Sequence, residues 1–246
     1  MAFHTILTEV QESGVAILRL NRPARLNALS VQMRREVSRC LADWRDDAAV
    51  GAVILTGEGR SFSAGFELEE FRDPELRAEV LDSSTRYHRD VWYFPKPTIA
   101  AVNGLAVGGG FDLATLCDLR IASEAAWFSH PELAHGAPPL FTPLSWIVGG
   151  AVARDLCLTR RRLTALEAER LGLVTDVVAA DELLGEARRL ARRVLEAPAG
   201  AVRYFKEVVA TGCGRSFDAA FAEEHDRAFR EVILRPEMAL TARPPA

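Results

Sequence analysis

The sequence has few cysteines, no long apolar run and no excess of basic residues, and each absence narrows the possible functions. There is no CxxC pair, and all four cysteines lie in apolar patterns: Cys40, Cys117, Cys157 and Cys213. We expect reduced, buried thiols rather than a disulfide framework. The N-terminus has no basic segment followed by an apolar one, and no apolar run approaches the length of a membrane span. We therefore expect a cytoplasmic, soluble protein with no membrane partner.

The charge balance is slightly acidic, with a formal net charge of −4 and a pI near 5.8. An acidic chain without a basic stripe is not expected to bind nucleic acid. Hydrophobic residues make up 49% and charged residues 26% of the 246 residues, which is ordinary for a globular protein of enzyme size. This length permits one large domain, or a core with an appendage.

The stretch from 96 to 118 has the clearest local pattern. Thr98 to Val102 is a short apolar run typical of a buried strand, and Asn103-Gly104 predicts a turn. Three glycines, 108–110, then open an apolar helical pattern. A strand, a glycine-rich turn and a helix start together leave unpaired backbone N–H groups at the positive end of the helix dipole. A developing negative charge would be stabilised there.

The rest of the chain predicts an α/β core followed by a helical C-terminal region. Ser30 is a plausible N-cap for a helix over 31–46. Strands are predicted at 15–20, 50–56, 98–102, 119–122 and 173–178, and residues 127–128 form a short apolar piece. Further helices are predicted at 74–92, 146–158, 165–171, 182–195, 201–210 and 217–232. The apolar side chains of the last helix should pack on the core or on another subunit.

Two carboxylates follow the glycine turn and are candidates for proton chemistry. Asp112 lies near the helix start, where the helix dipole alone would favour an acid. Glu132 follows His130-Pro131 in an apolar segment. Apolar surroundings would raise its pKa and let it hold or deliver a proton, although a solvated surface acid is the simpler alternative.

Other motifs fit less well. Gly59-Arg-Ser61-Phe-Ser63 is not the GxSxG nucleophile elbow, and Gly108-Gly-Gly110-Phe-Asp-Leu113 lacks the third glycine of a dinucleotide fingerprint. His130, Glu132 and His135 do not have the HExxH spacing of a zinc site, so no metal is expected. Residues 223–226, Glu-Glu-His-Asp, are most simply the solvated face of the last helix.

Several spaced motifs resemble the crotonase (enoyl-CoA hydratase/isomerase) superfamily. Leu20-Asn-Arg-Pro23 with Leu26-Asn-Ala-Leu29 is similar to its opening signature, and Ser61-Phe-Ser-Ala-Gly-Phe-Glu-Leu68 to its F-x-A-G-A-D-L loop. Residues 97–118 match its central signature nearly throughout, and Thr164 to Val174 its later segment. The resemblance covers almost the whole chain.

The resemblance implies a crotonase-like spiral of ββα turns over residues 1–190 and a helical C-terminal trimerisation region over 191–246, giving a homotrimer or a dimer of trimers. It implies an acyl-CoA thioester substrate, no further cofactor and no metal. It assigns the oxyanion-hole amides to Phe66 and Gly109. It also places a group of residues against the CoA nucleotide and pantetheine: Arg25, Leu26, Ala28, Ala64, Glu67 and Leu68.

The resemblance further implies that Glu132 and Asp112 match the two catalytic glutamates of the hydratases, with Asp112 one methylene shorter. Residues 136–144, which include Phe141, replace the usual glycine-rich stretch and should shape the acyl pocket. Leu140 lies near where the dehalogenase branch has a nucleophilic aspartate, which argues against that reaction. We expect reversible hydration of an α,β-unsaturated acyl-CoA. The alternatives are double-bond isomerisation or decarboxylation through the same enolate, and a non-catalytic member that binds an acyl carrier or a partner protein.

Overall fold

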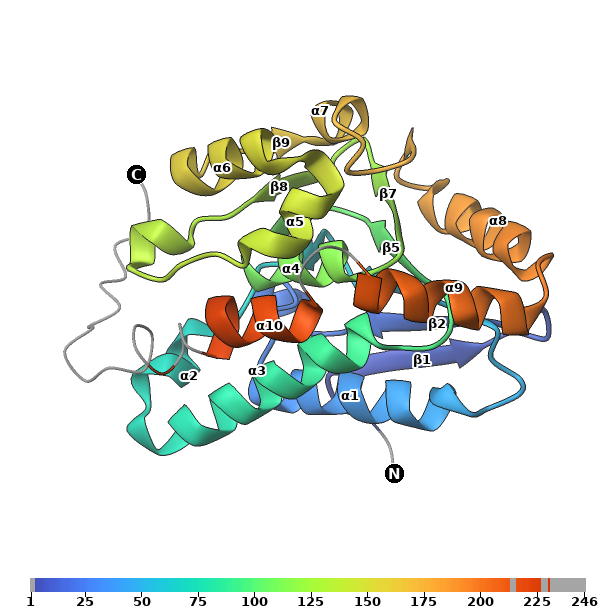
Figure 1. The fold of residues 1–246 in the computed structure, drawn as a ribbon, viewed down its shortest axis with the longest axis horizontal. Coiled ribbons are helices and arrows are strands. Elements are labelled where there is room, and N and C mark those ends of the chain that lie inside the picture. Colours follow the sequence, from blue (N-terminus) through green and yellow to red (C-terminus); the bar gives the residue numbers. More distant parts are fainter. Residues whose placement is uncertain (1–2, 213–215, 227–229, 231–246) are drawn as a thin grey trace.

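Two sheets form the centre of the molecule in a computed structural model that describes residues 3–212, 216–226 and 230 (Figure 1). The larger sheet has, in spatial order, β1 (Ile6–Val10), β2 (Val15–Leu20), β3 (Ala52–Gly57), β5 (Thr98–Val102), β7 (Leu119–Ser123) and β10 (Val177–Val178). Only the β1–β2 pair in it is antiparallel. The smaller sheet has β4 (Ser61–Ser63), β6 (Leu105–Val107), β8 (Trp127–Ser129) and β9 (Leu163–Thr164).

The chain repeats a ββα unit, which confirms the expected α/β spiral. In successive units, β3, β5 and β7 join the larger sheet, and the strands that follow them, β4, β6 and β8, join the smaller one. The main helices of these turns are α1 (Val31–Arg45), α3 (Arg77–Trp92) and α4 (Gly109–Leu116). The Ser30 hydroxyl accepts a hydrogen bond from the Met33 amide, so the predicted N-cap of α1 is present.

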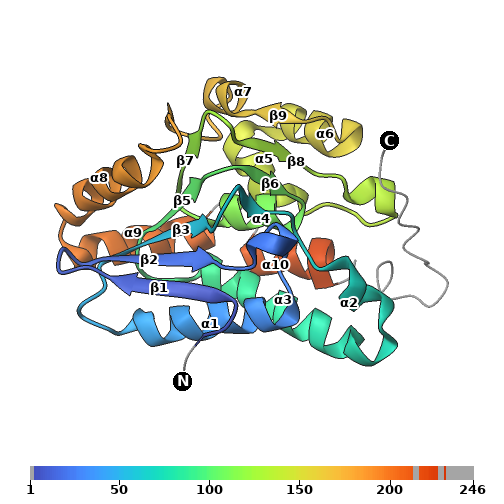
Figure 2. The ribbon, with the colours of Figure 1, turned by 180° about the vertical axis from the view of Figure 1, so that it is seen from behind.

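Side chains of the larger sheet alternate between two hydrophobic layers, as the period of two in a strand requires. One layer contains Ile17, Ile54 and Ile121 and packs against α8 (Leu183–Leu195). The other contains Leu18, Leu55 and Val102 and faces the cluster that includes side chains of α1, α3 and α4. Figures 1 and 2 show α8 on one side of the sheet and α1 and α3 on another. The predicted boundary between the spiral core and the C-terminal region, at residue 190, lies inside α8. This division of the chain stays a prediction.

Several boundaries differ from the sequence prediction. The helix expected over 146–158 is two helices, α5 (Phe141–Val148) and α6 (Gly150–Thr159), because Gly149 between them has a left-handed φ of 78°. The helix expected over 74–92 begins with a 3-10 turn at Pro74–Leu76, where proline fits the first position. Of the strand expected over 173–178, only β10 forms. The remaining helices are α2 (Leu68–Arg72), α7 (Ala165–Arg170), α9 (Ala199–Gly212) and α10 (Phe217–Phe221).

The start of the last predicted helix is α10, which continues as a π-helical turn, Ala222–Asp226. Phe217 and Phe221 are buried against the main core, as expected. The prediction of a solvated face over 223–226 is wrong for His225, which is only 5% exposed because it packs against α3. Of the residues predicted to extend this helix, 227–229, 231 and 232 lie outside the described part of the chain.

The expected buried thiols are confirmed for three cysteines: Cys40, Cys117 and Cys157. Cys213 lies outside the described residues. Within the described residues, no helix combines the length and the apolar character needed to cross a bilayer.

Asn27 joins the loop after β2 to the loop that leads into β4. It is fully buried and has a φ of 55°, a conformation that asparagine tolerates better than most residues. Its side-chain oxygen accepts the Arg22 amide at 2.9 Å. Its side-chain nitrogen donates to the carbonyls of Glu58 and Ser61 at 2.9 and 2.8 Å. This one side chain therefore fixes the segment 25–29 relative to β4.

We expect Asn27→Ala to lower the free energy of unfolding by about 3 kcal/mol, since buried polar groups lose their partners. Chemical denaturation measures this. Asn27→Gly is the matched control, because glycine removes the same hydrogen bonds and relieves the left-handed backbone. If the glycine variant were as stable as the wild type, the backbone conformation and not the hydrogen bonds would account for the loss.

Candidate active site

Three adjacent parallel strands of the smaller sheet bring the predicted site residues together. β4 pairs with β6, and β6 pairs with β8, all in parallel. The carboxyl ends of these strands therefore lie at one edge of the sheet. Phe66 follows β4, Gly109 follows β6, and Glu132 follows β8, each within three residues of its strand. Residues far apart in the sequence thus meet without any long loop.

The loops after β4 and β6 touch each other through glycine. Gly65 has a φ of 87°, and a Cβ on it would lie 2.7 Å from the Val107 carbonyl oxygen and 3.1 Å from the Gly109 amide nitrogen. Only a residue without a side chain allows this approach. The Gly65 carbonyl accepts a hydrogen bond from the Leu29 amide at 2.7 Å, which fixes the loop from its other side. The backbone just before Phe66 is therefore held against the first amide of α4.

The Phe66 ring adds to the contact between the loops after β4 and β6. It lies against the Gly109 backbone, and the guanidinium of Arg34 lies 4.9 Å from the ring centre. Arg34 is completely buried and donates to Ser83 Oγ at 3.0 Å and to the Leu29 carbonyl. Burial lowers the pKa of Arg34 to about 10, although the charge of Glu70 opposes this change. A buried cation thus supports the Phe66 loop from beneath.

Asp112 and Glu132 lie on either side of one imidazole ring. His130 Nδ1 is 3.2 Å from Glu132 Oε1, and its Nε2 is 3.9 Å from Asp112 Oδ1. The ring is buried and stacks on Phe111, with 4.6 Å between ring centres. Burial alone would lower the pKa of His130. The charge of Glu132, its hydrogen bond to the ring and the charge of Asp112 outweigh burial, so the pKa is raised above its ordinary value.

Gly108 makes room for the Glu132 carboxylate. Its φ is 53°, and a Cβ on it would lie 3.1 Å from Glu132 Oε1. The Gly108 amide donates to the Ser129 carbonyl at 2.9 Å, so this glycine is tied to the end of β8 as well. The first glycine of the 108–110 run therefore positions an acid as well as starting a helix.

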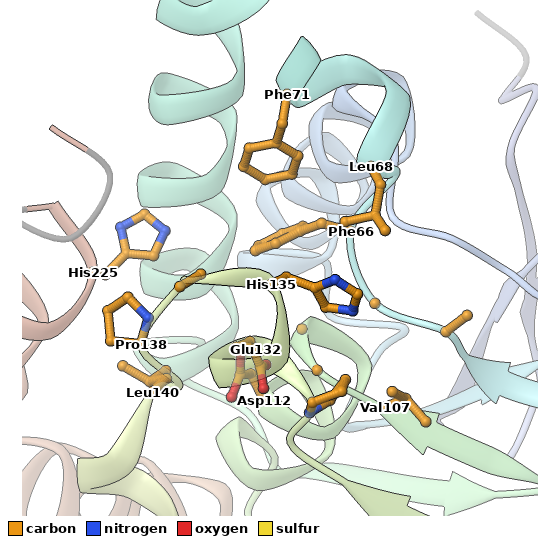
Figure 3. A pocket seen from close by; sticks show the side chains of 16 residues that line it. Phe66, Leu68, Phe71, Val107, Asp112, Glu132, His135, Pro138, Leu140 and His225 are labelled. Atoms are coloured by element: carbon orange, nitrogen blue, oxygen red, sulfur yellow. The ribbon is translucent and has the colours of Figure 1, made fainter. Parts of the chain in front are cut away.

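These residues surround a mainly apolar cavity of about 260 Å³. In Figure 3 the carboxylates of Asp112 and Glu132 lie side by side, with Phe66, Phe71 and Leu68 farther up the wall. The lining is Ala64, Gly65, Phe66, Leu68, Phe71, Val107, Gly108, Gly109, Asp112, Pro131, Glu132, His135, Ala137, Pro138, Leu140 and His225. Two acids in an otherwise mostly apolar cavity are suited to moving a proton on an apolar substrate.

The C-terminal segment closes one side of the cavity through a buried polar cluster. His225 Nε2 is hydrogen-bonded to Ser84 Oγ of α3, and His225 Nδ1 is 2.9 Å from Asp226 Oδ1. Asp226 also accepts from Thr85 Oγ1 at 2.8 Å. Burial would raise the pKa of Asp226, but hydrogen bonds from His225 and Thr85 outweigh it and lower the pKa to about 2. The segment is thus fixed to α3 beside the cavity.

The structure places the predicted site residues in two groups. Phe66, Gly109, Asp112, Glu132, Ala64 and Leu68 line the cavity. Arg25, Leu26, Ala28 and Glu67 are outside its lining. Arg25 forms ion pairs with Glu67 at 3.0 Å and with Glu69 at 2.7 Å. Phe141 does not line the cavity: its ring packs against the main core, and Pro138 and Leu140 from the same segment line the cavity instead.

Sequence reasoning missed the position of two histidines. His130 entered it only within a metal pattern, and His225 only as a surface residue. Within the described part of the chain, no group of three histidine, cysteine, aspartate or glutamate side chains is arranged to hold a metal ion. The one available signal for His130 was its place between the end of an apolar strand and Pro131-Glu132.

Comparison with known proteins assigns the chain to a family. Residues 10–235 match the family described as "Enoyl-CoA hydratase/isomerase". The chain is 40% identical over 230 residues to the probable enoyl-CoA hydratase echA8 of Mycobacterium tuberculosis (strain CDC 1551 / Oshkosh), covering 91% of this chain and 86% of that protein. It is 36% identical over 241 residues to the short-chain-enoyl-CoA hydratase of Clostridium acetobutylicum, covering 95% and 91%.

A solved structure agrees with these sequence matches. The crystal structure of an enoyl-CoA hydratase from Bacillus anthracis superposes with a TM-score of 0.82 at 30% identity, covering 92% of this chain and 90% of that one. The chain therefore belongs to the enoyl-CoA hydratase/isomerase family, the crotonase superfamily. The resemblance seen in the sequence motifs is confirmed.

We expect Gly108→Ala to reduce turnover of an enoyl-CoA thioester by up to about 100-fold, because the new methyl group displaces the Glu132 carboxylate. Gly172→Ala is the matched control: Gly172 also has a left-handed φ, of 74°, but a Cβ there meets nothing within 4 Å. Both variants should lose similar stability in thermal unfolding, while only Gly108→Ala loses activity. Equal activities in the two variants would contradict this assignment.

Proposed function

We propose that the protein hydrates an α,β-unsaturated acyl-CoA reversibly. One observation supports this most strongly: Asp112 and Glu132 share an apolar cavity with two glycine-bearing loops whose backbones are in contact. Water addition needs a group that positions water, a group that exchanges a proton, and donors that stabilise the charge on the thioester oxygen. The cavity contains a candidate for each. Names of relatives such as the short-chain-enoyl-CoA hydratase support the same reaction.

The donors in this proposal are the backbone amides of Phe66 and Gly109. Gly109 is the first residue of α4, where amides have no partner within the helix and the helix dipole is positive. The thioester oxygen gains negative charge as the enolate forms, so fixed donors stabilise the transition state more than the substrate. Removing one such donor from an oxyanion hole costs about 3–4 kcal/mol of transition-state stabilisation.

The two carboxylates divide the handling of water between them. Asp112 and Glu132 orient a water molecule over the β-carbon. Its oxygen bonds to that carbon, and the electrons of the double bond move to the thioester oxygen. Glu132 takes one proton from the water and passes it to the α-carbon as the enolate collapses. The products are a 3-hydroxyacyl-CoA and the regenerated carboxylate, so the reaction needs no cofactor beyond the CoA of the substrate.

The CoA moiety would extend from the cavity toward the segment 25–28 and toward Glu67. Arg25 is the exposed cation of this region. The Ala64 amide donates to the Leu26 carbonyl at 2.9 Å, so this segment is joined directly to the cavity wall. Phe141 would shape the acyl pocket indirectly, by supporting the Pro138–Leu140 stretch.

Double-bond isomerisation is the second candidate, and the position of Asp112 favours it. Asp112 is one methylene shorter than glutamate, and its Oδ1 lies 3.9 Å from His130 Nε2. An isomerase needs only one carboxylate to move a proton between two carbons, and Glu132 alone could do so.

We expect Glu132→Gln to lower the hydration rate by about 1,000-fold, because the amide cannot accept the proton from water. Loss of the 2-enoyl thioester absorbance measures the rate. Glu124→Gln, at an exposed glutamate, is the control and should retain full activity. A fully active Glu132→Gln variant would remove this residue from the mechanism.

The products distinguish the two reactions. Hydration in ¹⁸O-labelled water places the label on a 3-hydroxyacyl product, whereas isomerisation incorporates no oxygen. An enzyme that binds CoA but shows no hydration at any chain length would overturn the hydratase proposal.

We also propose a homotrimer, or a dimer of trimers, built through the C-terminal helices in the cytoplasm. Exposed apolar side chains support an assembly: on α9, Tyr204 and Phe205 are 69% and 66% exposed, and on α6, Leu158 is 65% exposed. Solvated helices rarely present such groups without a partner. The buried free thiols are consistent with a reducing compartment.

We expect Phe205→Asp to dissociate the assembly, because an unpaired charge in an apolar interface is costly. Light scattering after gel filtration should give a multiple of three of the 27.0 kDa chain mass for the wild type and a smaller mass for the variant. Arg203→Asp, at an exposed position two residues earlier on α9, controls for the added charge. A monomeric wild type would contradict the proposed assembly.

A further inference from the structure

His130 occupies a position that the proposed reaction does not explain. Its ring is 1% exposed and lies between the two carboxylates that act on water. It stacks on Phe111, the residue directly before Asp112, so the same helical turn presents one acid and fixes the plane of the ring. Phe111 in turn packs on Phe128 of β8, with 5.1 Å between ring centres. The ring is therefore packed within the core on the side away from the acids.

The contacts of Glu132 show what this ring does. Oε1 is held by His130 Nδ1, while the buried Oε2 has no hydrogen-bond partner among the described residues. A buried carboxylate oxygen without a partner calls for one, and a substrate or water in the adjoining cavity would provide it. The two oxygens therefore have separate tasks: one is anchored to the ring, and the other is left to exchange a proton.

Charge is the second part of the argument. Two ionised carboxylates in one low-dielectric cavity repel each other, and one of them would normally keep its proton. A protonated imidazole, hydrogen-bonded to Glu132 and 3.9 Å from Asp112 Oδ1, would reduce the local charge from −2 to −1. The raised pKa of His130 has this same cause. Tyr87 of α3, which also interacts with Asp112, stays neutral because burial raises its pKa far above the ordinary value.

We propose that His130 is a positioning residue that lies between Glu132 and Asp112, fixes Glu132 through Nδ1 and offsets the charge of the two acids. This role rests on the proposed function and adds a residue that acts on the two acids. His130 contacts no substrate. It fixes Glu132 Oε1 so that Oε2 faces the reaction, and it compensates the charge of the acid pair.

Three substitutions separate these roles. His130→Phe keeps the stacked ring and removes both nitrogens. His130→Asn keeps a donor near the position of Nδ1, and His130→Gln keeps one near that of Nε2. We expect kcat to fall by about 100-fold in His130→Phe and by about tenfold in His130→Asn, with KM changed less than about threefold. Wild-type kcat/KM should decline on the alkaline side as the ring loses its proton, and His130→Phe should lack this limb.

A second measurement does not depend on turnover. NMR titration of the histidine rings, with His130 identified by its absence in His130→Phe, should show that the ring keeps its proton to a higher pH than a free histidine does. Glu132→Gln should lower that pKa, and the exposed control Glu124→Gln should not. This result would support the charge pairing even if the wild type hydrated no enoyl-CoA, so failure of the reaction and failure of this role are distinguishable.

Three outcomes would overturn the proposal. One is a His130→Phe variant with wild-type kcat and pH profile. Another is a His130 ring whose titration is unaffected by Glu132→Gln. Equal losses of kcat in His130→Phe and His130→Asn, accompanied by equal losses of stability, would also overturn it, because they would show that the ring acts only through packing.

Discussion

The parallel pairing of β4, β6 and β8 is the constraint on which the site depends. Each strand has three residues, and each is followed within three residues by one part of the site. Their own hydrogen bonds are few, so the strands keep their places because the larger sheet and α4 pack against them. Asn27 adds fixed bonds where the segment 25–29 meets β4. The pairing of three short strands thus determines the position of a polar site.

The buried charges at this site have partners. Arg34 supports the Phe66 loop with Glu70 nearby at 3.6 Å, and His130 lies between two acids. Isolated buried charges would be prohibitive, but each of these has an opposite charge or several hydrogen bonds. Such buried polar groups fix the geometry of the site but do not maximise the stability of the fold. The positive charge of Arg34 near the Phe66 loop, and that proposed for His130 beside Glu132, would make the local potential more favourable for an anionic intermediate.

The sequence predicted the parts of this protein that depend on local pattern. Glycine spacing, strand hydrophobicity and the Ser30 cap predicted the α/β core, and the ordered motifs predicted the family. It could not predict contacts across the fold. The place of His130 depends on the register of β6 with β8, and the burial of His225 depends on how a C-terminal segment meets α3. The three-residue strands β4 and β6 were missed because three residues carry too little periodicity. Whether Phe66, Gly109 and the acids act as assigned stays a prediction.

The shortness of the connections after these strands has a consequence for how such a protein can diversify. One residue inserted between β6 and α4 would rotate the helix by about 100°, carrying Asp112 out of the cavity. The connections after β4, β6 and β8 therefore cannot change in length without moving the site. New substrates must be accommodated by exchanging side chains elsewhere in the cavity lining, around Phe71, Pro138 and Leu140. Variation in this scaffold is therefore confined to the side chains that line the cavity, while the strands and their connections keep their lengths.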